Sequence, residues 1–263
     1  MGMKQTFNYH THTYRCGHAV GNEEEYVKQA IVSGFKTLGF SEHMGYADWN
    51  DHSERIDYDK LDEYINDINK LKQKYQNDIT IYTGFEFEYF DDALEHLKNM
   101  QSKCDYLICG QHAYDRFNHY YDHRDYCDDY YIEFMANQVV KALDAGLTRY
   151  IAHPDYFLLS GKPLSESMKD SIKKICDAAL KYDAVIEINL KGMKYGRDPN
   201  QNFFYPNYQT YEIIAEKGCK VVIGYDAHAP QNLAERHKEV QIKTEFDSLN
   251  LNYIEDLKIE DLR

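Results

Sequence analysis

The sequence of 263 residues lacks the features that place a chain in a membrane or on nucleic acid. No apolar run approaches the roughly 18 residues of a membrane span, and no charged start followed by an apolar stretch marks an export signal. Basic side chains are in the minority, with 30 Lys and Arg against 44 Asp and Glu and a net charge of −14. Such a surface repels phosphate backbones, so we expect neither nucleic acid nor a membrane as partner.

Cysteine is also sparse. The six cysteines form no Cys-x-x-Cys pair, so without an export signal we expect reduced thiols and a cytoplasmic location. Cys16 is expected to be inert packing. No heptad or apolar patch is legible in the sequence, which leaves the oligomeric state open.

Short apolar runs alternate with longer amphipathic ones along the chain. Predicted strands cover 6–10, 37–41, 79–87, 106–110, 150–153, 184–190 and 220–226, with helical patterns between them and a last helix beginning near Pro230. Several runs, such as Val221-Val222-Ile223, are continuously apolar, as in parallel strands buried on both faces. Seven βα units can close a barrel or stay an open doubly wound sheet. We expect a single α/β domain over 1–263, a distorted (βα)7 TIM-like barrel, because of where the polar residues fall.

Residue types that bind metals recur where the predicted strands end. His10 and His12 close the first strand and, being two residues apart, point to the same side. Further members stand at strand ends or in the adjoining loops: His18, His43, Glu86, His112, His153, Asp226 and His228. A single histidine is more often a hydrogen-bonded core or surface residue. The C-terminal strand ends of a parallel barrel share one face, so the joint placement predicts a metal site there.

The donor set is seven imidazoles and two carboxylates without a thiolate. It suits Zn, Fe, Mn, Co or Ni and disfavours Ca and Mg. One ion cannot use nine donors, so we expect two or three divalent transition-metal ions with a bridging carboxylate. Three such ions and two carboxylates leave about +4, which favours hydroxide and a phosphate dianion. The pattern predicts hydrolysis of a small phosphorylated metabolite, with a metal-bridging hydroxide attacking phosphorus.

Seven short motifs resemble those of the polymerase and histidinol phosphatase (PHP) family. In that family's order they are His10-Thr11-His12, Cys16-Gly17-His18, Ser41-Glu42-His43, Gly84-Phe85-Glu86, Gln111-His112, His153-Pro154 and Asp226-Ala227-His228. The resemblance covers nearly the whole chain and implies a distorted barrel of seven βα units, usually with a trinuclear site. It implies one ion on His10, His12, Glu86 and Asp226, a second sharing Glu86 with His112 and His153, and a third on His18, His43 and His228.

Within that family the chain is similar to the stand-alone histidinol-phosphate phosphatases of histidine biosynthesis. The similarity lies in the length, the Cys-Gly-His spacing, the strand at 79–88, and Asn189-Leu190-Lys191-Gly192 followed by Arg197 and Tyr205-Pro206. It implies conversion of L-histidinol phosphate and water to L-histidinol and phosphate. The stretch 113–127 and the short loop 155–163 depart from the pattern, and both could line a different substrate pocket.

Four residues are candidates to bind the substrate. Arg197 comes first, because a guanidinium offers phosphate a forked donor. Lys191 and Arg116 are its rivals. Asn189 is expected to point into the barrel mouth, unless it only satisfies a backbone group.

Catalytic roles are assigned to Glu86, Asp226 and His228. His228, if only weakly bound to metal, is one candidate to protonate the leaving group, besides water or a loop residue. Glu42 and Asp155 flank proposed ligands and are expected to accept the spare imidazole protons; each could equally be a solvated loop acid.

Three other functions stay open. The same chemistry could act on a phosphotyrosine, a nucleotide or a sugar phosphate. The chain could be a non-catalytic metal-binding or polymerase-associated module, although it has no polymerase segment and a complete donor set. An amidohydrolase-type barrel would require a lysine ligand at a strand end, where only Lys191 stands.

Overall fold

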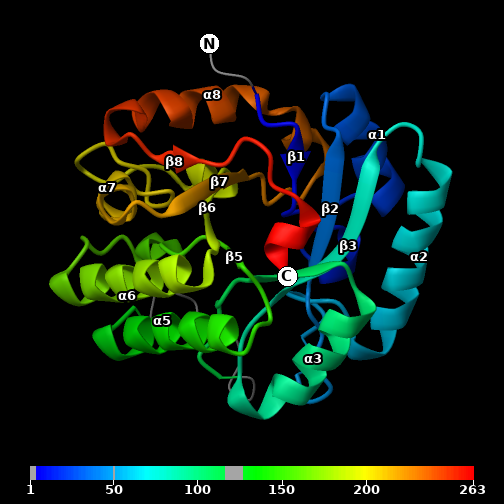
Figure 1. Cartoon of the computed structure of the whole chain (residues 1–263), viewed down its shortest axis with the longest axis horizontal. Coiled ribbons are helices and arrows are strands. Elements are labelled where there is room, and N and C mark those ends of the chain that lie inside the picture. Colours follow the sequence, from blue (N-terminus) through cyan, green and yellow to red (C-terminus); the bar gives the residue numbers. More distant parts are fainter. Residues whose placement is uncertain (1–3, 50, 116–126) are drawn as a thin grey trace.

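The computed structural model describes residues 4–49, 51–115 and 127–263, and its strands form one parallel sheet in chain order (Figure 1). They are β1 Phe7–Asn8, β2 Thr37–His43, β3 Thr80–Phe87, β4 Tyr106–Cys109, β5 Tyr150–Ile151, β6 Val185–Asn189, β7 Lys220–Gly224 and β8 Asn252–Tyr253. The first seven lie at the predicted runs. β8 was not predicted, because its two residues belong to no apolar run.

Helices alternate with the strands and lie around the outside of the sheet (Figure 1). They are α1 Glu23–Val32, α2 Leu61–Lys74, α3 Leu94–Lys103, α5 Asp129–Asp144, α6 Glu166–Tyr182, α7 Tyr208–Lys217 and α8 Arg236–Glu245. A capping box begins α1: the Asn22 side chain accepts from the Glu25 amide at 3.2 Å, and the Glu25 carboxylate accepts from the Asn22 amide at 2.7 Å. The last helix begins later than predicted, because Pro230–Ala234 forms a 3-10 turn before α8.

The ring closes between the extensions of β1 and β7. Thr11 and Ala227 form a parallel bridge, in which the Ala227 carbonyl accepts from the His12 amide at 2.9 Å. Nearer the start of both strands, the Gln5 side-chain amide takes the place of a strand, donating to the Ile223 carbonyl at 2.7 Å and accepting from the Ile223 amide at 3.2 Å. The predicted distorted barrel is therefore confirmed, with one seam made partly of side chains.

Tyrosines fill the interior of the barrel toward the N-terminal ends of its strands. The Tyr106 hydroxyl donates to the Tyr9 carbonyl at 2.7 Å, and the Tyr9 hydroxyl donates to the Leu257 carbonyl at 2.9 Å. Leu257 and Leu262 pack in the same cluster, so the C-terminal turn, near the middle of Figure 1, plugs the N-terminal end of the barrel. A tyrosine suits this place because its ring fills space while its hydroxyl satisfies a buried backbone group.

Within the described residues, none of the helices is both long and apolar enough to cross a bilayer. That residues 1–263 form one domain stays a prediction.

Candidate metal centre

All nine predicted donors lie at the C-terminal rim of the barrel. Each follows or ends a strand, and the Glu86 side chain lies at their centre with a 1% exposed fraction. Its Oε2 atom lies 3.2–3.3 Å from a ring nitrogen of each of three histidines, His10, His12 and His43. Its Oε1 atom lies 2.8 Å from His153 Nε2 and 3.6 Å from His112 Nε2. One carboxylate therefore faces two groups of imidazoles, as a bridging ligand must.

Asp226 reaches the same cluster from the other side of the seam. Its Oδ1 atom lies 3.5 Å from His10 Nε2, 3.4 Å from His12 Nε2 and 3.1 Å from His228 Nδ1. Asp226 and His153 both have positive φ, at 45° and 25°. Non-glycine residues held in that region are found at functional sites, where the surroundings over-determine the strain.

His18 and His228 face one another across the rim. Their Nε2 atoms are 3.0 Å apart. Each Nδ1 points to backbone carbonyls, at 3.1 Å from Cys16 and Ser53 for His18 and at 3.0 Å from Asp226 for His228. A ring that donates from Nδ1 presents a lone pair at Nε2, so two acceptors are brought together, an arrangement that a cation between them would stabilise.

Charge and protonation fit a metal site. Burial lowers the pKa of His12, His43 and His228, in the last case to about 4 with the Lys191 cation contributing. These rings are neutral at pH 7 and keep their lone pairs. Burial works to raise the pKa of Glu86, but the His10 imidazole, whose own pKa is raised by Glu187, outweighs it and holds the pKa of Glu86 well below its usual range, so Glu86 is ionised.

Within the described part of the chain, two of the donors have buried atoms that form no hydrogen bond of good geometry, although other donors lie 3.1–3.5 Å away. These atoms are both ring nitrogens of His12 and Oδ1 of Asp226. Leaving buried polar atoms unpaired costs about 1–3 kcal/mol each, and coordination would remove that cost. The residues present therefore fit two or three divalent ions, and the set includes the triad His12, His43 and His228, whose donor atoms lie within 4.8 Å of one another.

Sequence reasoning missed the carboxylate that orients His10. Glu187, in β6, is fully buried, and its Oε1 lies 2.7 Å from His10 Nδ1 while accepting from the Tyr150 hydroxyl at 2.8 Å. Its Oε2 accepts from the His153 amide at 3.1 Å. A glutamate inside the apolar run Val185-Ile186-Glu187-Ile188 was the available signal, because a charge buried in a strand requires a partner.

Glu88 stands in the same relation to His112. Its Oε1 lies 3.2 Å from His112 Nδ1, and its side chain is 1% exposed. Such a carboxylate fixes the tautomer of a ligand and turns Nε2 toward the metal.

The two carboxylates predicted for this supporting role are buried but placed differently. Glu42 accepts from the Thr13 amide, and burial raises its pKa to about 8. It lies beside His12 and Cys16, with one donor atom of each within 4.8 Å of the others. Asp155 accepts from the Asn207 amide at 2.7 Å, and burial raises its pKa to about 7. Neither is a solvated loop acid; contact with an imidazole proton stays a prediction for both.

Of the substrate-binding candidates, Lys191 lies at the cluster. Its Nζ is 3.0 Å from His228 Nε2 and 3.5 Å from Asp226 Oδ1. Asn189 also reaches the cluster, where its amide donates to Asp226 Oδ2 at 3.1 Å and its oxygen accepts from the Lys191 amide at 2.9 Å. Asn189 therefore holds a proposed ligand and also accepts from the first two backbone amides of the following turn.

Arg197 is engaged elsewhere. Its guanidinium pairs with the Glu245 carboxylate at 2.7 and 3.1 Å and stacks on the Phe203 ring at 3.7 Å. Its polar partners among the described residues are Glu245 and the Gln201 carbonyl and include none of the nine donors, so its predicted phosphate role gains no support. Arg116 lies outside the described residues.

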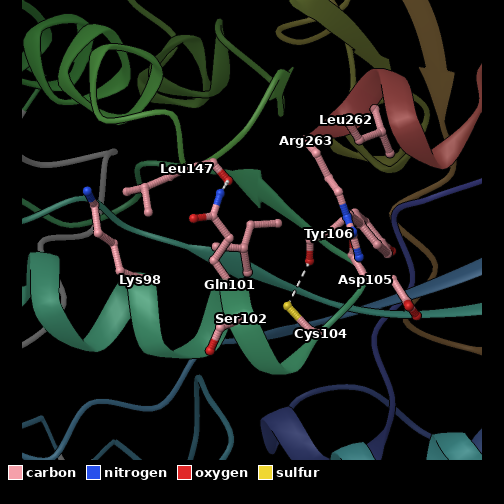
Figure 2. A pocket seen from close by; sticks show the side chains of 10 residues that line it. Lys98, Gln101, Ser102, Cys104, Asp105, Tyr106, Leu147, Leu262 and Arg263 are labelled. Carbon is pink, nitrogen blue, oxygen red and sulfur yellow. Dashed lines mark hydrogen bonds between the residues drawn. The ribbon is translucent and has the colours of Figure 1, made fainter.

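A cavity of about 310 Å³ lies at the opposite end of the barrel. Figure 2 shows its lining, from the end of α3, the start of β4 and the C-terminal turn, with the Cys104 thiol donating to the Tyr106 carbonyl at 3.2 Å. None of the nine donors lines this cavity, so the cavity is not part of the candidate metal centre.

Comparisons with known proteins agree with this geometry. A family model described as "PHP domain" matches residues 8–191. A protein of Deinococcus radiodurans named "probable histidinol-phosphatase" is 27% identical over 84% of this chain and 85% of its own length. One of Schizosaccharomyces pombe with the same name is 25% identical over 85% of this chain and 81% of its own length.

A solved structure has the same fold. It is the histidinol phosphate phosphatase of Lactococcus lactis, complexed with zinc, L-histidinol and phosphate. It superposes with a TM-score of 0.72 at 15% identity, covering 98% of this chain and 99% of that one. At that identity the likeness bears on the fold.

Proposed function

The chain belongs to the PHP domain family, and on that premise we propose that this metal-dependent phosphatase hydrolyses L-histidinol phosphate to L-histidinol and phosphate in the cytoplasm. The observation that carries the proposal is the convergence of nine donors at one rim, where five of the histidines face the Glu86 carboxylate. The names of the relatives support the substrate.

Three groups of side chains would hold the ions. His10, His12, Glu86 and Asp226 form the first, Glu86 with His112 and His153 the second, and His18, His43 and His228 the third. When bound, divalent ions supply positive charge for the phosphoryl oxygens and acidify water near neutral pH. Zn, Mn and Fe all suit an imidazole-rich set.

The surrounding charges leave that positive excess in place. The buried carboxylates Glu187 and Glu88 each add a negative charge that the sequence estimate omitted. The Lys191 ammonium and the buried Arg55 guanidinium offset them. The site therefore still favours a dianionic phosphate.

Within the chain, Lys191 is the cation placed to bind the phosphate. Its ammonium lies at the third group of donors and is only partly buried. Asn189 fixes both its backbone amide and the Asp226 carboxylate. Tyr156 lies beside the second group, with its ring centroid 5.1 Å from those of His112 and His153. An aromatic wall there suits a substrate that carries an imidazole ring.

A substrate panel tests the proposed specificity. Purified protein loaded with Zn²⁺ or Mn²⁺ should release phosphate from L-histidinol phosphate with a kcat/KM at least about 10²-fold above those of phosphotyrosine, a nucleotide monophosphate and a sugar phosphate. A higher kcat/KM for one of these competitors would mean that the competitor is the substrate, and the proposed phosphatase chemistry would stand. No phosphate release from any of them by metal-loaded protein would overturn the proposal.

Replacing Lys191 by Met should raise KM more than it lowers kcat. A charge-assisted hydrogen bond contributes about 1.5–3 kcal/mol, so we expect kcat/KM to fall by about 10- to 100-fold. Metal content should not fall, because the substitution removes a positive charge beside the site. Steady-state kinetics and elemental analysis measure both quantities.

Lys194→Met is the matched control, since Lys194 lies in the same turn but over the Tyr195 ring, with Nζ 4.8 Å from its centroid. Wild-type kcat/KM in the Lys191 variant would show that the phosphate is bound by another cation.

A further inference from the structure

Arg55 is a buried arginine in the segment between β2 and α2. Its exposed fraction is 2%, and its guanidinium carbon lies 3.4 Å from the centroid of Trp49, the one tryptophan of the chain. Arg55 belongs to none of the seven sequence motifs. A fully buried guanidinium is costly to desolvate, so its partners show what it does.

The guanidinium forms a fork with Glu88. Nη1 donates to Glu88 Oε2 at 3.1 Å, and Nη2 donates to Glu88 Oε1 at 3.3 Å. The same Oε1 lies 3.2 Å from His112 Nδ1. Because a planar fork fixes the plane of the carboxylate it holds, Arg55 sets where the acceptor for the His112 ring lies.

The same arginine also holds the end of β2. Nη1 donates to the Met44 carbonyl at 3.1 Å, directly after His43. The next residue, Ile56, donates its amide to the His43 carbonyl at 3.2 Å. Gly45 also lies against this segment. A Cβ at Gly45 would lie 2.4 Å from the Ile56 carbonyl oxygen, so there is no room for a side chain at this position. The segment around Arg55 is thus packed closely on the strand end that carries His43.

We propose that Arg55 is a positioning residue of the metal centre: through Glu88 it orients the His112 ring, and through the Met44 carbonyl it holds the strand end that carries His43. The inference rests on the proposed ligands. It connects His112, in the second group of donors, with His43, in the third. The arrangement Arg55–Glu88–His112 turns His112 Nε2 toward His153 Nε2, at 3.2 Å.

Packing alone does not account for this residue. An apolar side chain of similar volume would fill the space beside Trp49 without the desolvation cost of two buried charges, and such replacements are often neutral or stabilising. The pair of Arg55 and Glu88 places a carboxylate oxygen at His112 Nδ1. Partners of this kind typically contribute 10- to 100-fold to metal affinity.

Arg55→Lys tests the proposal, because lysine keeps the charge and loses the fork. Protein stripped of metal is titrated with Zn²⁺ against a chelator, and bound Zn²⁺ is counted by elemental analysis at fixed free Zn²⁺. We expect the weakest-bound ion to lose about 10- to 100-fold in affinity. Excess Zn²⁺ should restore kcat, which loss of folded protein would not allow. Wild-type Zn²⁺ affinity and stoichiometry in the variant would overturn the inference.

Arg236→Lys is the matched control. Arg236 is also buried, with its guanidinium carbon 4.4 Å from the Phe35 ring centroid, and it pairs with Glu239 at 3.2 Å instead of with a carboxylate that touches a ligand. It should keep wild-type Zn²⁺ affinity. Equal losses in both variants would reduce Arg55 to a general stability role and overturn the inference.

Glu88→Gln gives a second route, also usable if Arg55→Lys does not fold. It keeps the size and an acceptor oxygen, and it should weaken the same ion. In the double variant the two losses should be smaller than their sum, because both act through one contact. If the two losses in Zn²⁺ affinity were fully additive, Arg55 would not act on His112 through Glu88. Absence of Zn²⁺ binding by the wild-type protein would instead overturn the proposed function.

Discussion

Replacing Glu86 by Gln is expected to lower kcat by about 10³-fold or more and to release metal from the protein. Gln has the shape of Glu, but its amide nitrogen is a donor and carries no charge. The Glu86 oxygens face five imidazole nitrogens at 2.8–3.6 Å. Loss of the charge removes the bridge between two groups of donors, so the effect should exceed the 10- to 100-fold typical of supporting residues. Elemental analysis and phosphate release measure the two losses.

Glu239→Gln is the control for loss of a buried carboxylate as such. Glu239 has an exposed fraction of 1%, accepts from the Gln5 amide at 2.7 Å and pairs with Lys243 at 3.0 Å. It touches none of the proposed ligands, so its substitution should cost stability and leave metal content per folded molecule unchanged. Near-normal turnover in Glu86→Gln would contradict the proposed bridge.

The rim of donors could be predicted from the sequence because the signal is local. A histidine or acid at the end of an apolar run is visible in one line of sequence, and the parallel barrel then brings all such ends to one face. His10 and His228 are far apart in the chain, yet each was assigned from its own neighbours. The topology of the barrel then places both residues on one face, and no long-range contact had to be predicted.

The supporting residues could not be predicted in the same way, because they depend on which side chains meet across the barrel. Glu187 reaches His10 over a separation of 177 residues, and neither neighbourhood alone identifies the other. Arg197 shows the converse. Its guanidinium suggested a contact with phosphate, but it pairs with the Glu245 carboxylate, 48 residues away on α8.

Two glycines at the rim leave space for buried carboxylates, which the sequence patterns did not predict. Gly224 and Gly110 each lie against a buried carboxylate. A Cβ at Gly224 would lie 1.6 Å from Glu187 Oε1, and a Cβ at Gly110 would lie 1.8 Å from Glu86 Oε1. The absence of a side chain at these positions makes room for the acids that organise the donors.

Gly110→Ala should therefore disable the metal centre without altering any donor. The added methyl group cannot coexist with the observed Glu86 carboxylate, whose Cδ would lie 2.6 Å away, so the carboxylate must rotate or the strand must shift. A displacement of about 1 Å at a catalytic group can cost about 10²-fold in rate. We expect kcat to fall at least that far and at least one ion to bind more weakly, as measured by phosphate release and Zn²⁺ titration.

Gly84→Ala separates this effect from crowding of the barrel in general. Gly84 lies in β3, two residues before Glu86, and a Cβ there would meet the Tyr106 ring at 2.5 Å inside the barrel. Overpacking of that kind typically costs about 1–3 kcal/mol of stability, but it does not touch the carboxylate. Gly84→Ala should thus unfold at lower temperature while keeping its Zn²⁺ affinity, whereas Gly110→Ala should lose affinity while still folded. The same Zn²⁺ affinity in both variants would mean that Glu86 does not need the space that Gly110 leaves.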